Sequence, residues 1–379
     1  MSFQLTSEQE MIRLMAKDFA RKELKPFADK RDEENIFPDD AVRKMGNLGL
    51  LGMMVSPEYG GSGAGTVSYS LALQEIAYEC ASTAVTMSVA NLSTEPLLKF
   101  GNDYQIKSYL IPLASGKKLG AFALTEPEAG SDPGGMKMRA EDKGDYYLVN
   151  GTKIFITHGD QAETINLIAR TDPEKATRGL SAFIVENTFP GFSVGSKENK
   201  MGLRASHTVE LIFEDCKIPK ENLLGREGQG FKIAMTALDS GRIGIASQAT
   251  GIARACLDEA IAYSRNRRQF GRSISSFQAV QWMIADISTQ LEASSWLTLS
   301  AADLKDRDLP FTKEASMAKL FASETANKAA YSALQIHGGY GYTKEYKIER
   351  LYRDARATTI YEGTSEIQRI VIAREMLRQ

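Results

Sequence analysis

Cysteine and histidine are scarce in this chain, and their scarcity limits the chemistry that it can support. Only three residues of each type occur among 379. Cys80, Cys216 and Cys256 lie far apart and form no C-x-x-C pair, so we expect buried, reduced thiols in a reducing compartment, the bacterial cytoplasm. The histidines are equally scattered and show no metal-ligand spacing, so no metal is expected.

An excess of charge and long apolar runs are also lacking. The formal net charge is −2, so the composition predicts no basic surface for nucleic acid or an anionic membrane. No apolar run is long enough to span a membrane, and the first residues, MSFQLTSEQEMIR, lack the apolar core of a signal peptide. What is present, 43% hydrophobic and 25% charged residues, is typical of a globular protein with a sizeable core.

The order of sequence textures predicts an α+β fold with three domains. A helical domain at 1–117 is followed by a middle β domain at 118–225, whose short runs are rich in β-branched and aromatic residues. A C-terminal helical bundle at 226–379 completes the chain. The β domain is expected to be antiparallel, with both helical ends packing on or beside it.

Local signals refine this plan. Ser7-x-x-Glu10 has the spacing of a helix capping box. The stretch 67–89 is rich in Ala, Leu and Met with few charges, which predicts a helix buried on most sides. Asn150-Gly151, between YYLV and TKIFIT, predicts a two-residue hairpin turn. Three long patterns of helical period, at 231–271, 277–305 and 312–339, predict the bundle together with a short last helix.

The segment ATTIYEGTSEIQR predicts the start of that last helix and a candidate acid. Ser365 and Gln368 have capping-box spacing, and Gly363 gives freedom for a bend. Glu362 is then expected beside a helix N-terminus, where backbone N–H groups and the dipole act on an anion or a polarised carbonyl. The alternative is an acid that only favours the helix dipole on a surface turn.

Two stretches of the middle domain suit a flat, polar-edged ligand. FALTEPEAGSD is expected where a strand runs into a loop, and its Thr125, Ser131 and backbone N–H groups are candidate donors. KIFIT sets Phe155 and Thr157 on one face of a strand, which suits a planar cofactor such as flavin. A plain strand-to-turn connection, and a core Phe with an edge Thr, are the structural alternatives.

Three stretches of the last third have both structural and functional interpretations. RNRRQFG places arginines before Gly271, which fits a helix C-cap or, through an arginine, a phosphate contact. ALDSGR sets Asp239 and Arg242 one turn apart, usually a solvated ion pair. QIHGGYGY permits close approach of a phosphate, but it lacks the strand–glycine loop–helix context of a site for nicotinamide adenine dinucleotide.

Together these stretches resemble the acyl-CoA dehydrogenase family, in particular its short-chain, butyryl-CoA type. ALTEPEAGSDPGG and QIHGGYGYTKEYKIERLYRD resemble the two family signatures, and IYEGTSEIQR resembles the catalytic segment. The likeness covers essentially the whole chain. It implies a helical domain, a β-barrel-like domain and a four-helix bundle, assembled as a homotetramer (a dimer of dimers) with FAD between the β domain and the bundle.

The resemblance also implies the role of each matched position. Glu362 matches the catalytic base. Positions that match flavin contacts are Phe122, Leu124, Thr125, Ser131, Phe155 and Thr157. From the neighbouring subunit come Arg267, Phe270 and Gln278, followed by Gln335, Gly338, Gly339, Thr364 and Glu366. Positions that match contacts to the CoA thioester are Ser131, Asp239, Arg242 and Gly363.

The mechanism so implied is removal of the α-proton of an acyl-CoA by Glu362 while a hydride leaves the β-carbon for flavin N5. The product is a trans-2-enoyl-CoA, and an electron-transfer flavoprotein is the implied electron acceptor. Because an α-C–H is a very weak acid, the thioester carbonyl needs hydrogen bonds, and burial is expected to raise the pKa of the base. Relatives with the base on an earlier helix have it at the position of Gly241, which cannot hold a proton.

Several alternatives remain open at this stage. Acyl chain length, a cyclic or branched acyl group and the physiological direction of the reaction are not determined by these motifs. No arginine stands near Val89-Ala90-Asn91, which argues against a dicarboxylic substrate. A flavin oxidase or monooxygenase on the same fold is the rival enzyme class. A DNA-binding or scaffold relative would need a basic surface, which the net charge of −2 does not favour.

Overall fold

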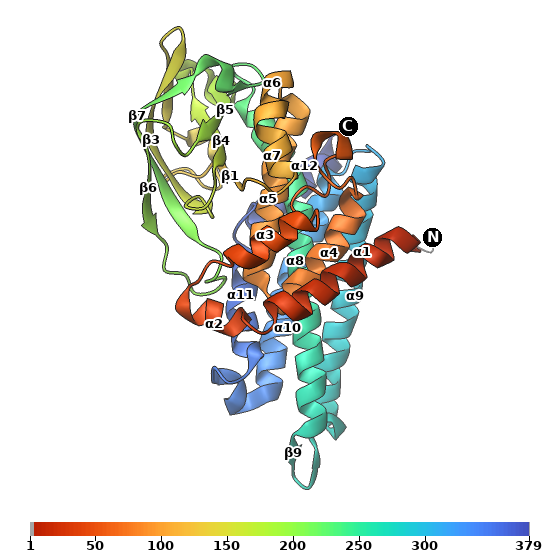
Figure 1. Cartoon of the computed structure of the whole chain (residues 1–379). Helices are drawn as coiled ribbons and strands as arrows, with labels where there is room; N and C mark the ends of the chain where they lie inside the picture. The colour runs from red at the N-terminus through yellow and green to blue at the C-terminus, as the bar shows by residue number, and fades with distance from the viewer. Residues whose placement is uncertain (1–3, 379) are drawn as a thin grey trace.

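A computed structural model describes residues 4–378, which form helices, then a sheet, then helices again (Figure 1). The β domain lies at one end of the molecule beside α5 (Ala81–Phe100) and α7 (Ile111–Ala114). Long C-terminal helices extend away from it toward the opposite end. This arrangement confirms the predicted α+β fold class.

The N-terminal helices differ from the prediction in two details. Thr6, not Ser7, caps the first helix, and it forms its capping box with Gln9. Thr6 has extended backbone angles, as a cap needs, whereas Ser7 is already helical. The expected single helix at 67–89 is two helices, because Cys80 (φ −148°, ψ 99°) breaks the run. The remaining helices of this part are α1 (Ser7–Phe19), α2 (Ala28–Glu34), α3 (Asp39–Asn47), α4 (Gly65–Glu79) and α6 (Asp103–Gln105).

The middle part is one eight-stranded sheet, mostly antiparallel; seven of its strands follow the order β6-β7-β3-β2-β4-β5-β8, and β1 lies off this order beside β4. Strand β1 pairs parallel with β4, and β2 meets β4 in a single parallel residue pair. The strands are β1 (Gly120–Ala123), β2 (Arg139–Asp142), β3 (Tyr146–Thr157), β4 (Thr164–Arg170), β5 (Leu180–Glu186), β6 (Phe192–Lys197), β7 (Thr208–Pro219) and β8 (Leu223–Leu224).

The hairpin predicted at Asn150-Gly151 is wrong. Both residues lie inside β3, a continuous strand of 12 residues, at a shift of register against β7. Gly151 has φ 142°, so the extra residue of this bulge needs glycine. The Asn150 amide donates to Asp215 Oδ1 (3.1 Å), and its Oδ1 accepts from the Asp215 N–H (2.8 Å), which holds the bulge where a turn was expected.

The C-terminal part contains one helix more than predicted. Its helices are α8 (Gly230–Asn266), α9 (Gln278–Asp306), α10 (Thr312–His337), α11 (Lys347–Ala357) and α12 (Ser365–Leu377). Helix α11 was missed because KEYKIERLYRDAR is strongly charged. Gly271 does not cap α8; it lies in the turn of a small hairpin, β9 (Arg268–Gln269) and β10 (Arg272–Ser273), with φ 76°.

Helix α8 links all parts of the molecule, because it packs against α4, α5, α9 and α10 and also meets β5. Small residues allow close contacts: a Cβ on Gly251 would lie 2.5 Å from the Gln74 carbonyl oxygen of α4. Alanines of α10 fill the facing side, with Ala322, Ala326 and Ala330 fully buried. Such packing leaves little room for local movement of α8 and α10, which carry part of the site described below.

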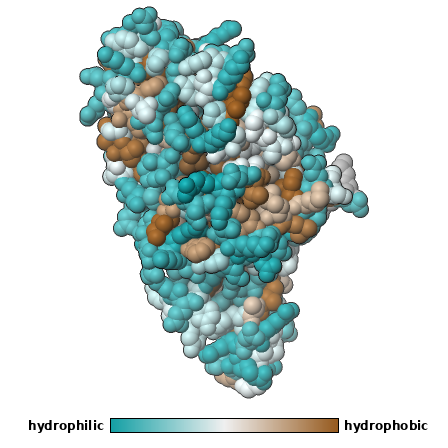
Figure 2. Space-filling view, in the orientation of Figure 1, coloured by the Kyte–Doolittle hydropathy of each residue, from teal (hydrophilic) through white to brown (hydrophobic). Residues whose placement is uncertain are grey.

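The face seen in Figure 2 is largely hydrophilic, with hydrophobic side chains in separate patches. No helix among residues 4–378 is long and apolar enough to cross a membrane. In the same part of the chain, no group of three or more His, Cys, Asp and Glu residues has an arrangement that could hold a metal ion.

Candidate active site

Glu362 stands in a strained connection between two helices. The segment follows α11, and Thr364 caps α12 by accepting from the Ile367 N–H (3.4 Å), so the predicted capping box at Ser365 begins one residue too late. Glu362 has φ 52° and Gly363 has φ 88°, both left-handed. A glutamate in this conformation is costly and persists only where its surroundings hold it, which is a common feature of active sites.

Two side chains hold the backbone of this connection. Gln368 Nε2 donates to the carbonyl oxygens of Glu362 (3.2 Å) and Gly363 (2.9 Å) instead of closing a capping box. Lys319 Nζ, from α10, donates to the same Gly363 oxygen (2.7 Å). Within the described residues, the backbone N–H of Glu362 has no acceptor, so it is free to donate to a ligand.

The carboxylate of Glu362 is shielded and only partly neutralised. The residue is half-buried, but its Oε2 has no solvent access and no hydrogen-bond partner in residues 4–378. A Cβ on Gly241 of α8 would lie 2.6 Å from this oxygen, so the glycine leaves the space in front of it. Burial raises the pKa of Glu362 to about 7, against the positive charges of Arg242 and Lys319. The expected direction of the shift is confirmed.

Asp239 and Arg242 do not form the solvated pair that their spacing suggested. Arg242 is buried, and its Nη1 donates to Asp239 Oδ1 and to Ser316 Oγ (3.3 Å). Asp239 Oδ2 accepts from Thr312 Oγ1 (2.7 Å). Arg242 Nε is buried without a partner among the described residues. The pair therefore sets a cation in the interior beside Glu362, because α10 covers this side of α8.

Several residues near Glu362 were missed from the sequence. Tyr69 donates to Ser88 Oγ (3.1 Å), and a Cβ on Gly244 would lie 2.6 Å from the Tyr69 hydroxyl, so both side chains need that glycine. Tyr361 donates to Gln248 Oε1, and Gln248 Nε2 donates to the Ala81 carbonyl (2.9 Å). Tyr69, Ser88 and Gln248 sit in the buried helices α4, α5 and α8, where one polar side chain resembles ordinary core and carries no local signal. Tyr361 lies in the connection itself, beside Glu362.

The loop after β1 is built on a buried ion pair. Lys153 of β3 has no exposed surface, and its Nζ donates to the Leu124 carbonyl (2.8 Å) and to Glu126 Oε1 (2.7 Å). The Ile154 N–H donates to the Thr125 carbonyl (2.9 Å). We call residues 124–131 the flavin loop from here on, after the cofactor contacts that the family resemblance implies for them. Its conformation is therefore fixed by the neighbouring strand, and Ser131 at its end is exposed.

Phe155 and Thr157 lie beside this loop on β3. Phe155 has φ 58° at a second register shift against β7, and 58% of its surface is exposed. Ile156 between them is buried, whereas Phe155 is exposed and Thr157 is half-buried, so the two lie on one face of the strand, as predicted. Phe122 on β1 and Leu124 pack partly against a core that includes Leu97 of α5 and Ala234 of α8.

The remaining predicted residues form a separate group at the far end of the bundle. Phe270 is 93% exposed in the β9–β10 hairpin, and the Arg267 guanidinium lies 5.4 Å from the centre of the Tyr340 ring. Gly338 and Gly339 have open space where a Cβ would stand. A cavity of about 550 Å³ is lined by residues that include Arg267, His337, Gly338 and Gly339. Gln278 and Gln335 are exposed nearby on α9 and α10.

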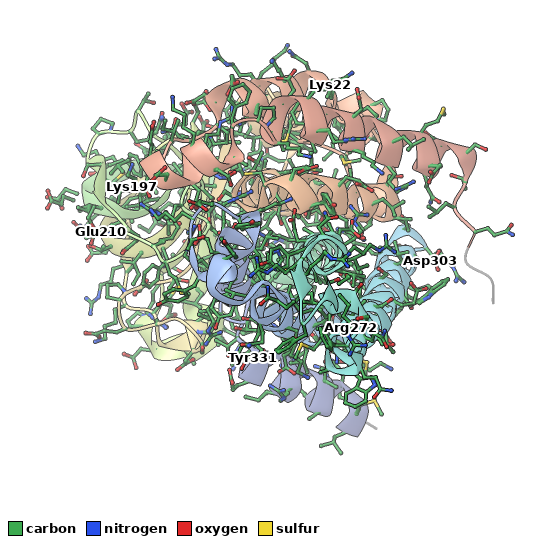
Figure 3. All side chains as sticks on the ribbon, turned by 90° about the horizontal axis from the view of Figure 1, so that it is seen from below. Lys22, Lys197, Glu210, Arg272, Asp303 and Tyr331 are labelled. Atoms are coloured by element: carbon green, nitrogen blue, oxygen red, sulfur yellow. The ribbon has the colours of Figure 1, made fainter. Side chains whose placement is uncertain are left out.

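The structure thus divides the predicted site into two groups. Glu362 lies against Gly241 of α8, and Asp239 and Arg242 belong to the same helix. Leu124 of the flavin loop packs against a core that includes Ala234, also of α8. The second group, which we call the hairpin group, consists of Arg267, Phe270, Gln278, Gln335, Gly338 and Gly339, and it lies away from the β domain. In Figure 3, Arg272 of the β9–β10 hairpin is seen beside the C-terminal helices, whereas Lys197 and Glu210 lie on the β domain to one side. Figure 1 shows β9 at the opposite end of the molecule from the β domain, so the two groups lie apart in the chain's fold. Thr364 and Glu366 lie on the first turn of α12, with the Glu362 group.

Comparisons with known proteins agree on one family. The models for the N-terminal, middle and C-terminal domains of acyl-CoA dehydrogenase match residues 6–117, 121–216 and 228–377. The short-chain specific acyl-CoA dehydrogenase of Clostridium acetobutylicum is 48% identical over 379 residues, with 100% of each chain covered.

Two solved structures are nearly superimposable on the chain. Butyryl-CoA dehydrogenase from Megasphaera elsdenii matches with a TM-score of 0.98 at 44% identity, covering 100% of both chains. A chain from structural work on the electron transferring flavoprotein of Acidaminococcus fermentans and flavin-based electron bifurcation matches with a TM-score of 0.99 at 48% identity, again over 100% of both.

Proposed function

The chain belongs to the acyl-CoA dehydrogenase family, and we propose that it oxidises a short-chain acyl-CoA to the trans-2-enoyl-CoA with Glu362 as the base. The observation that carries the proposal is the shielded, unpartnered Oε2 of Glu362, with free space in front of it at Gly241. An aliphatic α-C–H bond needs a carboxylate that is desolvated, ionised and fixed in direction, and this residue meets these conditions.

Glu362 accepts the α-proton on Oε2, and the rest of its segment supports that step. The backbone N–H of Glu362 is free and donates to the thioester carbonyl, where negative charge develops. Its left-handed backbone presents this N–H and the side chain to the same substrate. With a pKa of about 7, the group is a stronger base than an ordinary glutamate and is still substantially ionised at neutral pH. Asp239, Arg242, Gly363 and Ser131 are proposed contacts to the thioester and its CoA.

The chain's residues fit FAD as the cofactor. Exposed Phe155 and half-buried Thr157 offer a flat aromatic face and a hydroxyl beside the flavin loop, whose exposed Gly130 has no heavy atom within 4 Å of a Cβ position. Phe122, Leu124, Thr125 and Ser131 would hold the flavin on this side, and Thr364 and Glu366 on the side of α12. When bound, FAD would supply the acceptor for the hydride that leaves the substrate β-carbon.

We propose that a second copy of the chain completes the cofactor site. The hairpin group (Arg267, Phe270, Gln278, Gln335, Gly338 and Gly339) offers a cation, an exposed aromatic ring and open glycines, which suit the diphosphate and adenine half of FAD. This group lies apart from the flavin loop of its own subunit. In a dimer, the hairpin group of each subunit would reach the flavin loop of the other, and two such dimers would form a homotetramer. Phe270, which is 93% exposed in the single chain, would then be covered.

The acyl group is proposed to be short. Tyr361 adjoins the base and donates to Gln248, which is itself anchored to the Ala81 carbonyl, so the hydrogen-bonded pair closes the interior beside Glu362. An electron-transfer flavoprotein is proposed as the electron acceptor; the relative from work on the Acidaminococcus fermentans flavoprotein supports this partner.

Anaerobic addition of butyryl-CoA to the purified protein tests the proposal. We expect a yellow protein whose visible flavin band bleaches promptly, with a long-wavelength charge-transfer band. A yellow protein that stays oxidised with butyryl-CoA but bleaches with a longer or cyclic acyl-CoA would correct only the acyl group. A protein that binds no FAD, or that reduces with no acyl-CoA, would overturn the proposal.

A further inference from the structure

Lys319 is a buried lysine without an ion pair. It lies in α10, has no exposed surface, and its Nζ donates to the Gly363 carbonyl (2.7 Å). Burying an unpaired ammonium is costly. Three other lysines of the interior have carboxylate partners: Lys153 with Glu126 (2.7 Å), Lys305 with Glu95 (3.0 Å) and Lys347 with Glu79 (3.4 Å). Half-buried Lys200, which donates to the Ser206 carbonyl (2.7 Å), forms no ion pair among the described residues, but Lys319 has no exposed surface at all. Within residues 4–378, no carboxylate oxygen lies within 4 Å of Lys319 Nζ.

The charges around Lys319 centre on the proposed base. The carboxylate of Glu362 is the strongest attractive charge on Lys319, Arg242 of α8 repels it, and Glu366 and Glu324 attract it more weakly. Glu362 in turn is stabilised as an anion by Arg242 and Lys319, while Tyr69 of α4 and the neighbouring Tyr361 also face its charge. Two cations therefore face the carboxylate, and neither forms a hydrogen bond with it.

Two side chains, Lys319 and Gln368, hold the backbone of the Glu362 segment, but only Lys319 brings a positive charge to it. Gln368 Nε2 donates to the same Gly363 carbonyl and also to that of Glu362. A neutral amide is enough to hold this backbone, so the ammonium of Lys319 adds a charge that the segment does not need for its shape. Burial lowers the pKa of Lys319 to about 7 and raises that of Glu362 to about 7, and each charge opposes the shift of the other, so the two groups titrate as a coupled pair near neutral pH.

We propose that Lys319 is a positioning residue that holds the Gly363 carbonyl and, through its charge, keeps Glu362 ionised before the α-proton is transferred. This inference rests on the proposed function of Glu362. A base in a closed apolar site must be ionised at working pH and still accept a proton, and a nearby cation that does not hydrogen-bond the carboxylate shifts this balance without occupying Oε2. When Glu362 becomes neutral, the Gly363 carbonyl remains as the partner of Lys319.

The test compares Lys319→Met with Gln368→Met. The first removes a donor and a charge from the Gly363 carbonyl, and the second removes only a neutral donor. The rate of flavin reduction is measured against pH in anaerobic stopped flow. We expect the midpoint of the Lys319→Met profile to rise by about one pH unit or more. The Gln368→Met variant should reduce more slowly at every pH with an unchanged midpoint. Lys319→Arg, which keeps the charge, should restore the wild-type midpoint.

A second readout does not depend on turnover. Infrared difference spectra titrate the C=O band of protonated Glu362, assigned by its absence in Lys319→Met/Glu362→Gln. In Lys319→Met this band should persist to higher pH than in the wild type. Where Lys319→Met does not fold, Lys319→Gln, whose amide still donates, replaces it.

The outcomes separate this inference from the proposed function. A folded neutral variant with both the kinetic midpoint and the infrared band unmoved overturns the role of Lys319 and leaves Glu362 as the base. If neither neutral variant folds but Lys319→Arg does, the charge serves the fold, and the inference is also overturned. If Glu362→Gln reduces flavin normally, the proposed function itself fails.

Discussion

The flavin loop and the Glu362 segment are each fastened by a fully buried lysine, yet the two lysines differ in what surrounds them. Lys153 donates to the Leu124 carbonyl and is neutralised by Glu126, whose carboxylate also accepts from the Met138 N–H (3.2 Å). Lys319 donates to the Gly363 carbonyl in the same way but has no carboxylate at hydrogen-bond distance. The charge of Lys153 is therefore neutralised by a bonded carboxylate, whereas that of Lys319 is not.

The difference follows from the roles that we propose for the two regions, a cofactor surface for the flavin loop and the base for Glu362. A surface that receives a cofactor needs a fixed shape, and a hydrogen-bonded buried pair specifies shape without leaving a net charge. A reacting carboxylate needs nearby cations that do not hydrogen-bond to its oxygens, because a salt bridge at Oε2 would prevent this oxygen from accepting the proton. The contrast between Lys153 and Lys319 is therefore a contrast between positioning alone and positioning with tuning.

The largest effect is expected from Glu362→Gln. The amide keeps the size of the side chain but cannot accept the α-proton, so flavin reduction by butyryl-CoA should slow by about 10²–10⁴-fold or more. The protein should stay yellow and still bind the acyl-CoA, as an unchanged flavin-to-protein ratio and a ligand-induced spectral shift would record. Glu58→Gln, an exposed change far along the chain from the segment, is the control and should reduce at the wild-type rate.

The next largest effect is expected when the buried ion pair between Lys153 and Glu126 is broken. Lys153→Met leaves Glu126 buried without its cation, and breaking a buried pair in this way costs about 3–5 kcal/mol. The free energy of unfolding should fall by that amount in urea titrations, and FAD should be lost on gel filtration. Adding Glu126→Gln should recover part of the loss. Lys137→Met, on the exposed pair with Glu128 of the same loop, should change neither quantity. A stable, yellow Lys153→Met protein would remove the distinction drawn between the two lysines.

The raised pKa of Glu362 predicts that the stability of the protein depends on pH. The pKa of Glu362 is raised in the folded state from 4.5 to about 7, so between these values the folded state holds a proton that the unfolded chain has lost. The free energy of unfolding must therefore fall as pH rises through this window, by on the order of 1–3 kcal/mol. Urea titrations from pH 5 to 8 should detect this fall in the wild type relative to Glu362→Gln, because other groups cancel in the difference. Equal slopes for the two proteins would mean that Glu362 is solvated and ordinary.

The sequence predicted the order of the parts and the candidate base, because helical period, strand composition and the IYEGT segment are local signals. Errors arose where distant residues decide local structure. Asn150-Gly151 is a turn signal in isolation, but pairing with Asp215 keeps it inside β3. Arg242 looked like a surface residue until α10 covered it. Lys319 was not found at all, because EASMAKLF is an ordinary helical pattern and its partner, the Gly363 carbonyl, is 44 residues away.

The smallest effect is expected from Thr364→Ala, which asks what holds the Glu362 segment. Thr364 accepts from the Ile367 N–H at 3.4 Å, a long bond, so the loss in unfolding free energy should be about 1 kcal/mol or less. Thr6→Ala, which breaks a complete capping box at 3.1 and 2.9 Å, should cost at least as much and is the matched control. If Lys319 and Gln368 hold the segment, the pH midpoint of flavin reduction in Thr364→Ala should stay at the wild-type value. A shifted midpoint would mean that the cap, rather than the buried lysine, sets the geometry of the base, and the comparison between the two lysines would then concern only their charge.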